Sequence, residues 1–163
     1  MTENTLAIPR HKTAIHRTDL SRPLKCALRD GLLGCGTSLF DYGCGHGHDL
    51  DLCHSQGIAA AGWDPVFRPD VPLQHADVVN LGFVLNVIED TAERAAALGH
   101  AWRLAGRLLV VAAQVHVAGR GHSAVEFGDG VLTRRGTGPI RRGGGKLPQR
   151  LVAPASCCES SQD

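Results

Sequence analysis

The sequence has no long run of apolar residues and no large excess of charge of either sign. None of its apolar stretches approaches the roughly eighteen residues that a membrane-spanning helix needs. The first residues, MTENTLAIPRHK, also lack the apolar segment of a secretory signal. Lys and Arg number 17 against 16 Asp and Glu, so the net charge of +1 gives the whole molecule no strong attraction for nucleic acid or membranes. We expect a cytoplasmic protein that does not enter a membrane.

A disulfide framework and internal repeats are not indicated either. The chain has six cysteines, but 163 residues with 43% apolar content can bury a core without cross-links. Charged residues make up 20% of the chain, as in globular proteins. We therefore expect reduced thiols and a globular domain of ordinary size.

Composition divides the chain into three segments. Residues 1–35 form a basic lead that begins loosely ordered and ends in a helix, and residues 36–118 form an α/β core. Residues 119–163 are rich in Gly, Arg, Pro and Ser without a sustained period, which predicts a disordered or non-native tail. The basic lead could contact DNA phosphates or simply be a solvated helix face. We expect the fold to be truncated at its C-terminal end.

Strand and helix patterns alternate through the core. Short apolar runs predict strands at 38–43, 58–64 and 107–117, and a longer apolar run at 76–88 predicts a strand and the turn beyond it. Helical spacing predicts helices at 20–31, 48–56 and 90–106. Ser21 is a candidate N-cap of the first helix, and Asp90 with Glu93 forms a capping-box pattern for the last. Alternation of this kind predicts an α/β fold with a parallel sheet, right-handed crossovers and covering helices.

A glycine-rich stretch, FDYGCGHG, follows the first predicted strand. A dinucleotide fingerprint requires the spacing G-x-G-x-x-G. Here the glycines fall at 43, 45 and 47, and His48 occupies the place of the third glycine. The spacing therefore disfavours a dinucleotide and, with it, an NAD-dependent oxidoreductase.

The same stretch contains residues that can bind zinc. The candidates are Cys44, His46, His48, Cys53 and His54. Zinc motifs space paired ligands by two to four residues and supply a second pair at a distance, whereas these ligands alternate with glycines in one tight turn. We expect no metal site.

An acid followed by G-x-G-x-G is similar to the S-adenosylmethionine loop of methyltransferases. Bare glycine backbone allows close approach of a ligand. Asp41 can act on the amino-acid end of the methionine, and the N-terminus of the following helix favours its carboxylate. Asp64 ends the next predicted strand, where it can accept hydrogen bonds from both ribose hydroxyls. Alternatively, Asp64 is a solvated acid before Pro65.

The third predicted strand adds three candidates. Asp77 opens this strand, and Asn80 and Asn86 lie at its end and in the turn beyond. The two asparagines face the substrate or hydrogen-bond the backbone, and both interpretations remain open. The predicted cofactor-binding residues are Asp41, Gly43, Cys44, Gly45, Gly47, Asp64 and Asp77, and the substrate-facing candidates are Asn80 and Asn86.

Four stretches together resemble a known family. RHKTAIHRTDLSRPLKCALRDGLL, FDYGCGHGHDL, GWDP and ADVVNLGFVLNVIEDTAER are similar to methyltransferases associated with bacterial DNA phosphorothioation. The resemblance covers roughly residues 8 to 137. It implies a Rossmann-like fold, S-adenosyl-L-methionine as cofactor, and DNA or DNA-modification proteins as partners. It does not imply a methyl acceptor.

The chain departs from common methyltransferase patterns in two ways. The twelve residues between Asp64 and Asp77 leave no room for the usual helix and third strand, so the adenine contact is unassigned. DNA amino-methyltransferases carry [Asp/Asn]-Pro-Pro-aromatic where this chain has NLGF, and no cysteine follows a proline as in cytosine-carbon enzymes. Catalytic residues therefore remain unassigned, and a non-catalytic module that binds cofactor or a partner is the alternative.

Overall fold

The computed structural model describes residues 10–116, 125–127, 130–133, 136–137 and 140–141. A parallel sheet of four strands in the order β2-β1-β3-β4 forms its centre. The strands are β1 (Ser38–Tyr42), β2 (Ala59–Trp63), β3 (Ala76–Gly82) and β4 (Ala105–Ala112). The helices of the sheet are α1 (Arg22–Arg29), α2 (His48–Ser55) and α3 (Thr91–Leu104). The prediction of a Rossmann-like α/β fold with a parallel sheet is confirmed.

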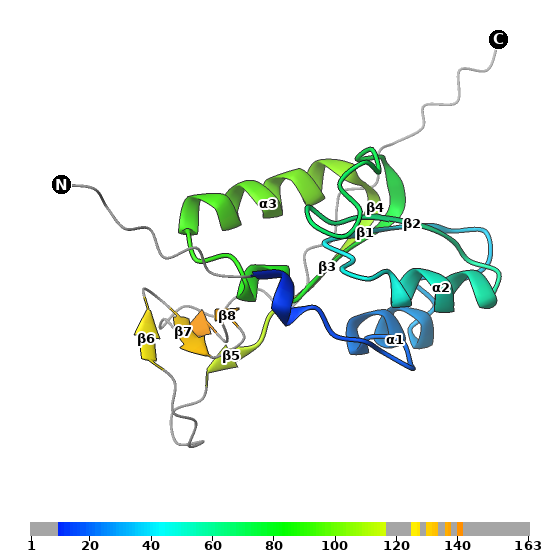
Figure 1. The fold of residues 1–163 in the computed structure, drawn as a ribbon. Helices are drawn as coiled ribbons and strands as arrows, with labels where there is room; N and C mark the ends of the chain where they lie inside the picture. Colours follow the sequence, from blue (N-terminus) through cyan, green and yellow to red (C-terminus); the bar gives the residue numbers. More distant parts are fainter. Residues whose placement is uncertain (1–9, 117–124, 128–129, 134–135, 138–139, 142–163) are drawn as a thin grey trace, which may run out of the picture.

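The helices lie on both faces of the sheet (Figure 1). On one face, Leu24 of α1 and Cys53 of α2 pack against Leu39 and Val78 of the sheet. On the other face, α3 presents small residues to the sheet and packs against its aromatic and branched side chains: Ala97, Ala101, Phe40, Val79, Leu81 and Leu109. Burial on both faces explains why the strands read as nearly continuous apolar runs.

The strand order creates a switch point between β1 and β3. The chain moves from β1 outward to β2, then crosses back over β1 to form β3 and β4. In open α/β sheets, ligands bind in the crevice outside the carboxyl ends of the strands at such a point. The loops that follow β1, β2 and β3 meet at this edge.

The connection between β2 and β3 contains no helix or strand apart from a single bridge between Asp64 and Arg68. The prediction that a helix and a further strand do not fit there is confirmed. As a result, β2 is the outermost strand on its side of the described sheet.

One predicted helix end agrees with the structure, and two others differ from it in detail. The Asp90 side chain accepts a hydrogen bond from the backbone N–H of Glu93 at 2.7 Å, as the capping-box pattern predicts. Ser21 is at the N-cap position of α1, but its side chain makes no capping hydrogen bond. At the other end of α3 the chain passes directly into β4, so Gly106 lies within the strand rather than ending the helix.

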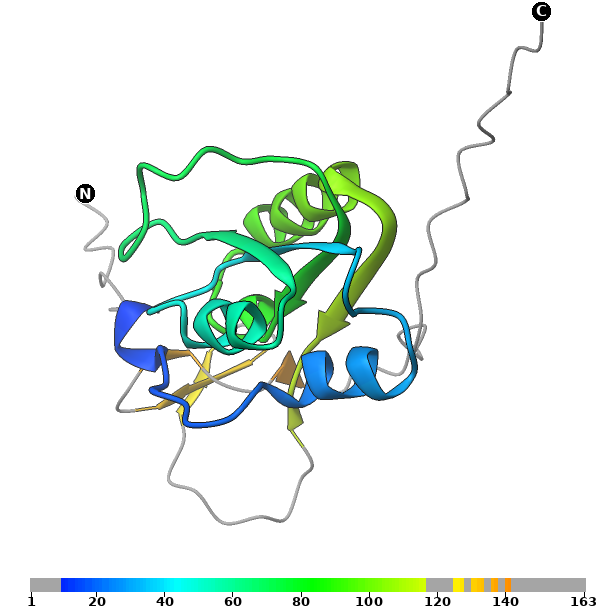
Figure 2. The same ribbon diagram turned by 90° about the vertical axis from the view of Figure 1, so that its right-hand side faces the viewer.

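Residues 10–20, which we call the N-terminal strap, run beside the loop that follows β1 (Figure 2). The strap begins with the 3-10 helix η1 (Arg10–Thr13). The Arg10 guanidinium pairs with two carboxylates, those of Glu89 and Glu93. The prediction of loose order is therefore wrong for residues 10–18, because contacts with distant residues hold them.

Short strands follow the main sheet. They are β5 (Val115–His116), β6 (Val125–Phe127), β7 (Gly130–Thr133), β8 (Gly136–Thr137) and β9 (Ile140–Arg141). β5 pairs with β9, and β6, β7 and β8 form an antiparallel sheet. The remaining residues of the predicted tail lie outside the described residues. No helix in the described part of the chain has the length and apolar character to cross a membrane.

Candidate cofactor-binding site

The loop after β1 adopts a backbone that only glycine adopts without strain. Gly43, Gly45 and Gly47 all have left-handed φ angles, of 83°, 55° and 85°. A Cβ on Gly43 would lie 2.4 Å from Cγ2 of Val84, and one on Gly47 would lie 2.5 Å from the guanidinium of Arg68. All three glycines are thus favoured by conformation, and Gly43 is required by close packing as well.

A cavity of about 1070 Å³ opens at the carboxyl edge of the sheet, beside this loop. Seven of the nine predicted site residues line it: Asp41, Gly43, Cys44, Gly45, Asp64, Asn80 and Asn86. The structure therefore brings together residues from the ends of β1, β2 and β3. Gly47 is buried beneath Arg68 rather than lining the cavity.

Asp41 and Asn80 form a buried pair across neighbouring strands. They lie in register in β1 and β3, and the Asn80 amide Nδ2 donates to Oδ1 of Asp41 at 2.8 Å. Asp41 is 4% exposed and Asn80 is 2% exposed. Burial raises the pKa of Asp41 to about 7, against the opposing effect of the Asn80 hydrogen bond. The Oδ1 atom of Asn80 is buried without a hydrogen-bond partner.

The Asp64 carboxylate connects the glycine loop to the turn that follows β2. Its Oδ2 accepts from the backbone N–H of Gly45 at 3.0 Å, and its Oδ1 accepts from those of Val66 and Phe67 at 2.9 and 3.0 Å. A carboxylate offers about four acceptor positions, so one remains on Oδ2 for a ligand. The ribose hydroxyls that were predicted to bind Asp64 would therefore compete with these backbone N–H groups for its oxygens.

Asp77 is the predicted residue that the structure does not bring to the site. It lies at the amino end of β3, and its carboxylate accepts hydrogen bonds from the Ser38 backbone N–H at 2.8 Å and the Ser38 hydroxyl at 2.7 Å. These hydrogen bonds lower the pKa of Asp77. The seven residues of β3 span roughly 20 Å, so Asp77 is at the opposite edge of the sheet from the glycine loop. Its role here is to join the starts of β1 and β3.

Asn86 has the backbone-bonding role that was one of its two predicted alternatives. Its amide Nδ2 donates to the Gln114 carbonyl at 2.7 Å, and its Oδ1 accepts from the Gln114 N–H at 2.8 Å. This double hydrogen bond fixes the turn after β3 to the end of β4. That turn begins at Phe83, which has a left-handed φ of 64°.

The cysteines and histidines near the loop do not converge on a metal. Burial and the neighbouring Asp41 raise the pKa of Cys44 to about 12, so it is a neutral thiol. Cys53 is fully buried in the core, and His54 is bonded to the Ala60 carbonyl. Within the described residues, no three His, Cys, Asp or Glu side chains are arranged to hold a metal ion.

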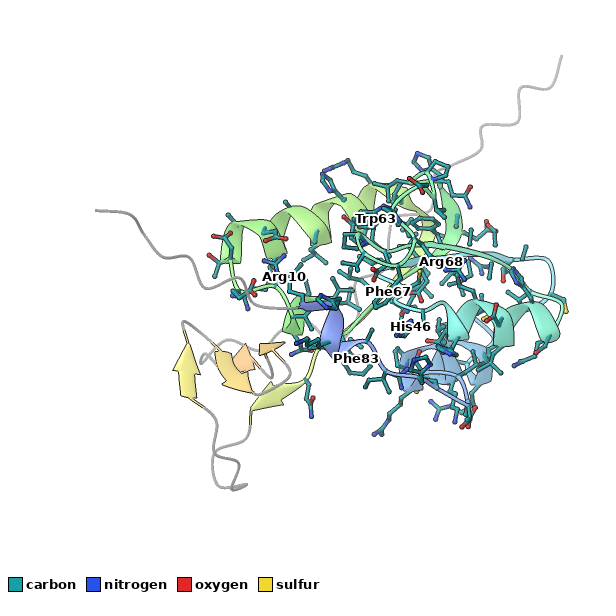
Figure 3. The ribbon with its side chains drawn as sticks, viewed as in Figure 1. Arg10, His46, Trp63, Phe67, Arg68 and Phe83 are labelled. Atoms are coloured by element: carbon teal, nitrogen blue, oxygen red, sulfur yellow. The ribbon has the colours of Figure 1, made fainter. Side chains whose placement is uncertain are left out.

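Three histidines and a phenylalanine instead form an aromatic cluster over the glycine loop. The His16 ring of the strap stacks on the His46 ring, and His46 in turn contacts Phe67 with ring centroids 4.1 Å apart. His16 Nδ1 is 3.2 Å from His48 Nε2. In Figure 3, His46, Phe67 and Arg68 lie close together beside the site. The sequence pattern did not indicate this cluster, because its members come from separate parts of the chain.

Ser21 and Asp49 also belong to the cavity lining, although neither was predicted as a site residue. The backbone N–H of Ser21 donates to Asp49 Oδ1 at 2.8 Å, which connects the start of α1 to the first turn of α2. The Ser21 hydroxyl is buried without a hydrogen-bond partner. In the sequence, the feature that could have indicated this part of the lining was Asp49, an acid in the first turn of the helix that follows the glycine loop.

Comparisons with known proteins give weak structural matches. No protein-family model matches the sequence, and no curated protein matches it. The chain is similar to magnesium protoporphyrin IX methyltransferase from Synechocystis PCC 6803 with bound SAH, at 17% identity and a TM-score of 0.42, over 59% of this chain and 54% of that one. It is also similar to an O-methyltransferase family protein from Burkholderia thailandensis, at 18% identity and a TM-score of 0.37, over 61% and 41%. The chain spans about half the length of these proteins.

Proposed function

We propose that the protein is an S-adenosylmethionine-dependent methyltransferase whose cofactor lies in the cavity between the carboxyl ends of β1 and β3. The buried Asp41–Asn80 pair carries this proposal. It lies at the switch point, lines the cavity and retains a buried amide oxygen without a partner. An unpaired buried polar atom in a residue that lines a cavity calls for a partner, which a ligand can supply.

The charges around the loop support a cationic cofactor. Asp41, Asp49 and Asp64 line the cavity near the glycine loop, and the arginines that line it, Arg10, Arg17 and Arg22, come from the strap and the start of α1. These carboxylates attract the sulfonium and ammonium groups of S-adenosylmethionine and repel the pyrophosphate of a dinucleotide. The Gly45 N–H, which could otherwise face a phosphate, already donates to Asp64. The cavity volume of about 1070 Å³ is slightly above the usual range for small-ligand sites, roughly 300–1000 Å³, so it has room for a cofactor.

The residues that line the cavity fit this cofactor. The reaction requires no covalent bond between the protein and the methyl group. When bound, it supplies an electrophilic methyl group for a substrate nucleophile. Asp41 and Asn80 hold the amino-acid end, the backbone of Gly43 and Gly45 allows close approach, and the remaining acceptor on Asp64 takes a ribose hydroxyl. The neutral Cys44 thiol is not a nucleophile at ordinary pH. Catalysis is then mainly alignment of the two reactants.

The strap and the aromatic cluster contribute part of the wall of the same cavity. Ala14 lies close to Gly45, since a Cβ there would be 3.4 Å from the Ala14 methyl. The stacked rings of His16, His46 and Phe67 extend this cover toward the turn after β2. Each protein wall of this kind reduces the contact of a bound cofactor with water and strengthens electrostatic contacts near it.

The resemblance noted in the sequence extends the proposal to a cytoplasmic DNA-modification system. Arg17 and Arg22 line the cavity, and neither forms an ion pair within the described part of the chain. They are available to DNA phosphates or to a partner protein. Fluorescence anisotropy with duplex DNA, with and without phosphorothioate linkages, tests this part. Binding that weakens with salt and on Arg17→Ala supports it, and no binding contradicts it.

Calorimetry with S-adenosylmethionine tests the cofactor assignment. We expect binding that Gly45→Val abolishes and that Asp64→Ala weakens by roughly 1.5–3 kcal/mol. Asp70→Ala, at an exposed acid of the same connection, is the matched control. Unchanged affinity in both site variants, or binding of NAD in place of S-adenosylmethionine, contradicts the assignment.

A tritiated-methyl assay against DNA, protein and small-molecule pools tests turnover. Transfer to one pool supports the enzyme and identifies its acceptor class. Tight cofactor binding without transfer to any pool identifies instead the non-catalytic module, for which the absence of an assigned base is the supporting observation.

A further inference from the structure

Four basic side chains from three separate segments meet beside the glycine loop. We call them the cationic patch: His16 of the strap, His46 and His48 around the last glycine of the loop, and Arg68 of the connection after β2. His46 also lines the cavity, whereas the other three are not part of its described lining. The patch is therefore largely separate from the proposed cofactor site.

Arg68 is held against the loop at the residue between the two loop histidines. A Cβ on Gly47 would lie 2.5 Å from Nη2 and 2.9 Å from Nε of Arg68, so the guanidinium lies directly over this glycine. Phe67, the residue before Arg68, contacts the His46 ring with centroids 4.1 Å apart, and Figure 3 shows these side chains together. The connection after β2 thus positions a permanent positive charge between His46 and His48.

The three imidazoles of the patch are in direct contact with one another. The His16 ring stacks on His46 with centroids 4.2 Å apart, and its Nδ1 lies 3.2 Å from Nε2 of His48. A hydrogen bond between two imidazole nitrogens needs one donor and one acceptor, so at least one of these two rings is neutral. When both rings are protonated, the same contact becomes repulsive unless an anion lies beside them.

The protein supplies no acid partner to the patch. Within the described residues, none of its four members forms an ion pair with a carboxylate. Asp64 accepts three backbone N–H groups and Asp49 accepts one, while Asp51 is exposed on α2. On the strap, the residue after His16 is another cation, Arg17. Positive charge in the patch is thus left for an external anion.

We propose that the cationic patch binds a phosphate group, and that the bound phosphate ties the strap to the glycine loop. A guanidinium presents paired N–H donors that match two phosphate oxygens, and a protonated imidazole donates through either nitrogen. Because the patch combines the strap, the loop and the connection after β2, one anion joins all three. The inference goes beyond the proposed function, since no part of it involves S-adenosylmethionine.

The affinity for an oxyanion should increase in mild acid. Partial burial lowers the pKa of His46, His16 and His48 act in the same direction, and Asp64 acts in the opposite one. A bound dianion favours protonated imidazoles and raises their pKa, so binding strengthens as the pH falls through their titration range. Sulfate is the suitable probe, because its charge is constant between pH 6.0 and 8.0 while that of phosphate changes. We expect sulfate to bind about tenfold more tightly at pH 6.0 than at pH 8.0.

NMR titration of the full chain with sodium sulfate tests the site, with sodium chloride at equal ionic strength as the reference. The ring signals of His16, His46 and His48 should shift saturably with sulfate at pH 6.0 and not with chloride. Deuterium exchange of the amides of residues 13–17 should be about threefold slower in sulfate at about twice its Kd than in chloride. Equal shifts and equal exchange in the two salts overturn the inference.

Two variants from different segments locate the site. Arg68→Gln and His48→Ala should each weaken sulfate binding at pH 6.0 about tenfold, because each removes a charged donor. The matched controls, Arg29→Gln at the exposed end of α1 and His75→Ala at an exposed position before β3, should bind like the wild type. A folding defect in one patch variant leaves the other to decide. Affinity that is unchanged in both patch variants overturns the inference.

Competition against sulfate distinguishes two sources of the phosphate group. Inorganic phosphate is compared with octathymidylate and with its uncharged methylphosphonate analogue. Displacement by octathymidylate at lower concentrations than inorganic phosphate, and not by the analogue, assigns the patch to a nucleic-acid backbone, and the reverse order assigns it to free phosphate. Displacement by neither, or by the uncharged analogue as well, overturns the inference. None of these measurements contains S-adenosylmethionine, so a failure here leaves the proposed function to its own test.

Discussion

The imidazole ring of His16 stacks on that of His46, with ring centroids 4.2 Å apart and planes inclined by 20°. His16 belongs to the N-terminal strap, and His46 belongs to the glycine loop. At the far end of the strap, Arg10 pairs with Glu89 and Glu93 near the start of α3 (Figure 3). Two separate anchors therefore hold the strap across the cavity.

Replacement of His16 should loosen one of these anchors. The variant His16→Ala loses the stacking contact with His46 and the contact with His48. We expect the amides of residues 13–17 to exchange with deuterium about three times faster than in the wild type. His75→Ala, at an exposed position in the connection before β3, is the control and should leave this exchange unchanged. Equal exchange in both variants would show that the stack does not hold the strap.

The same anchor should weaken in acid. Burial lowers the pKa of His46, with further lowering by His16 and His48, while Asp64 raises it. A histidine with a lowered pKa contributes stability that is present above its ordinary value, about 6.5, and is lost as the pH falls through the lowered value. Deuterium exchange of residues 13–17, corrected for intrinsic rates, should therefore increase as the pH falls from 7.5 to 5.5. A flat pH profile would exclude this effect.

Gly43→Ala should destabilise the fold strongly. The substitution combines a left-handed φ of 83° with a Cβ placed 2.4 Å from the Val84 side chain. We expect a loss of about 2–4 kcal/mol in the free energy of unfolding, measured by urea denaturation. Gly34→Ala is the control, because its Cβ meets nothing within 4 Å, and it should be near neutral. A mild effect at Gly43 would show that Val84 moves aside.

Asp41→Asn should make the ligand-free protein more stable at neutral and alkaline pH. Because burial raises the pKa of Asp41 to about 7, the wild type loses stability as the pH rises from about 4 through 7. Asparagine keeps an acceptor for Asn80 and has no charge to bury. Thermal denaturation from pH 4 to 8 should show a smaller pH dependence in the variant, and Asp70→Asn, at an exposed site, should behave like the wild type. An equally steep profile in Asp41→Asn would contradict the buried-carboxyl interpretation.

Asn86→Ala should separate a structural role from a role in substrate binding. Loss of both hydrogen bonds to the Gln114 backbone should cost about 1–3 kcal/mol of stability. We expect the affinity for S-adenosylmethionine to change by less than about threefold, because both polar groups of Asn86 are occupied by the backbone. A large loss of affinity with unchanged stability would instead make Asn86 a binding residue.

Local patterns predicted most of the core. The apolar runs that became β1 and β3 are mostly buried strands, the run that became β2 is a partly buried one, and the acid and glycines at the end of β1 form the loop that they predicted. Helix periodicity and the Asp90–Glu93 pattern located α3. These features are encoded within a few residues of each other, so the sequence alone reveals them.

The features that the sequence did not predict depend on contacts between distant parts of the chain. Arg10 is 79 residues from Glu89, and His16 is 32 residues from His48, so no local pattern indicates the strap. Asp77 was predicted as a site residue because it opens β3, whose other end lies at the site. In a parallel sheet, however, the first residues of the strands lie at the edge opposite the loops that form the site. The Ser21 hydroxyl was expected to cap its helix, and only the three-dimensional packing of α1 against Asp49 reveals that it does not.

The short connection after β2 has a further consequence for how the molecule behaves in solution. On its outer side, β2 has no neighbouring strand in the described part of the chain, so the backbone N–H and C=O groups that do not pair with β1 lack a strand partner. Such an unprotected border is a ready template for intermolecular β-pairing, through which two copies could join into a continuous ribbon or aggregate. A lysine or proline placed at the exposed Ala59 would be the simplest way to keep concentrated samples monomeric.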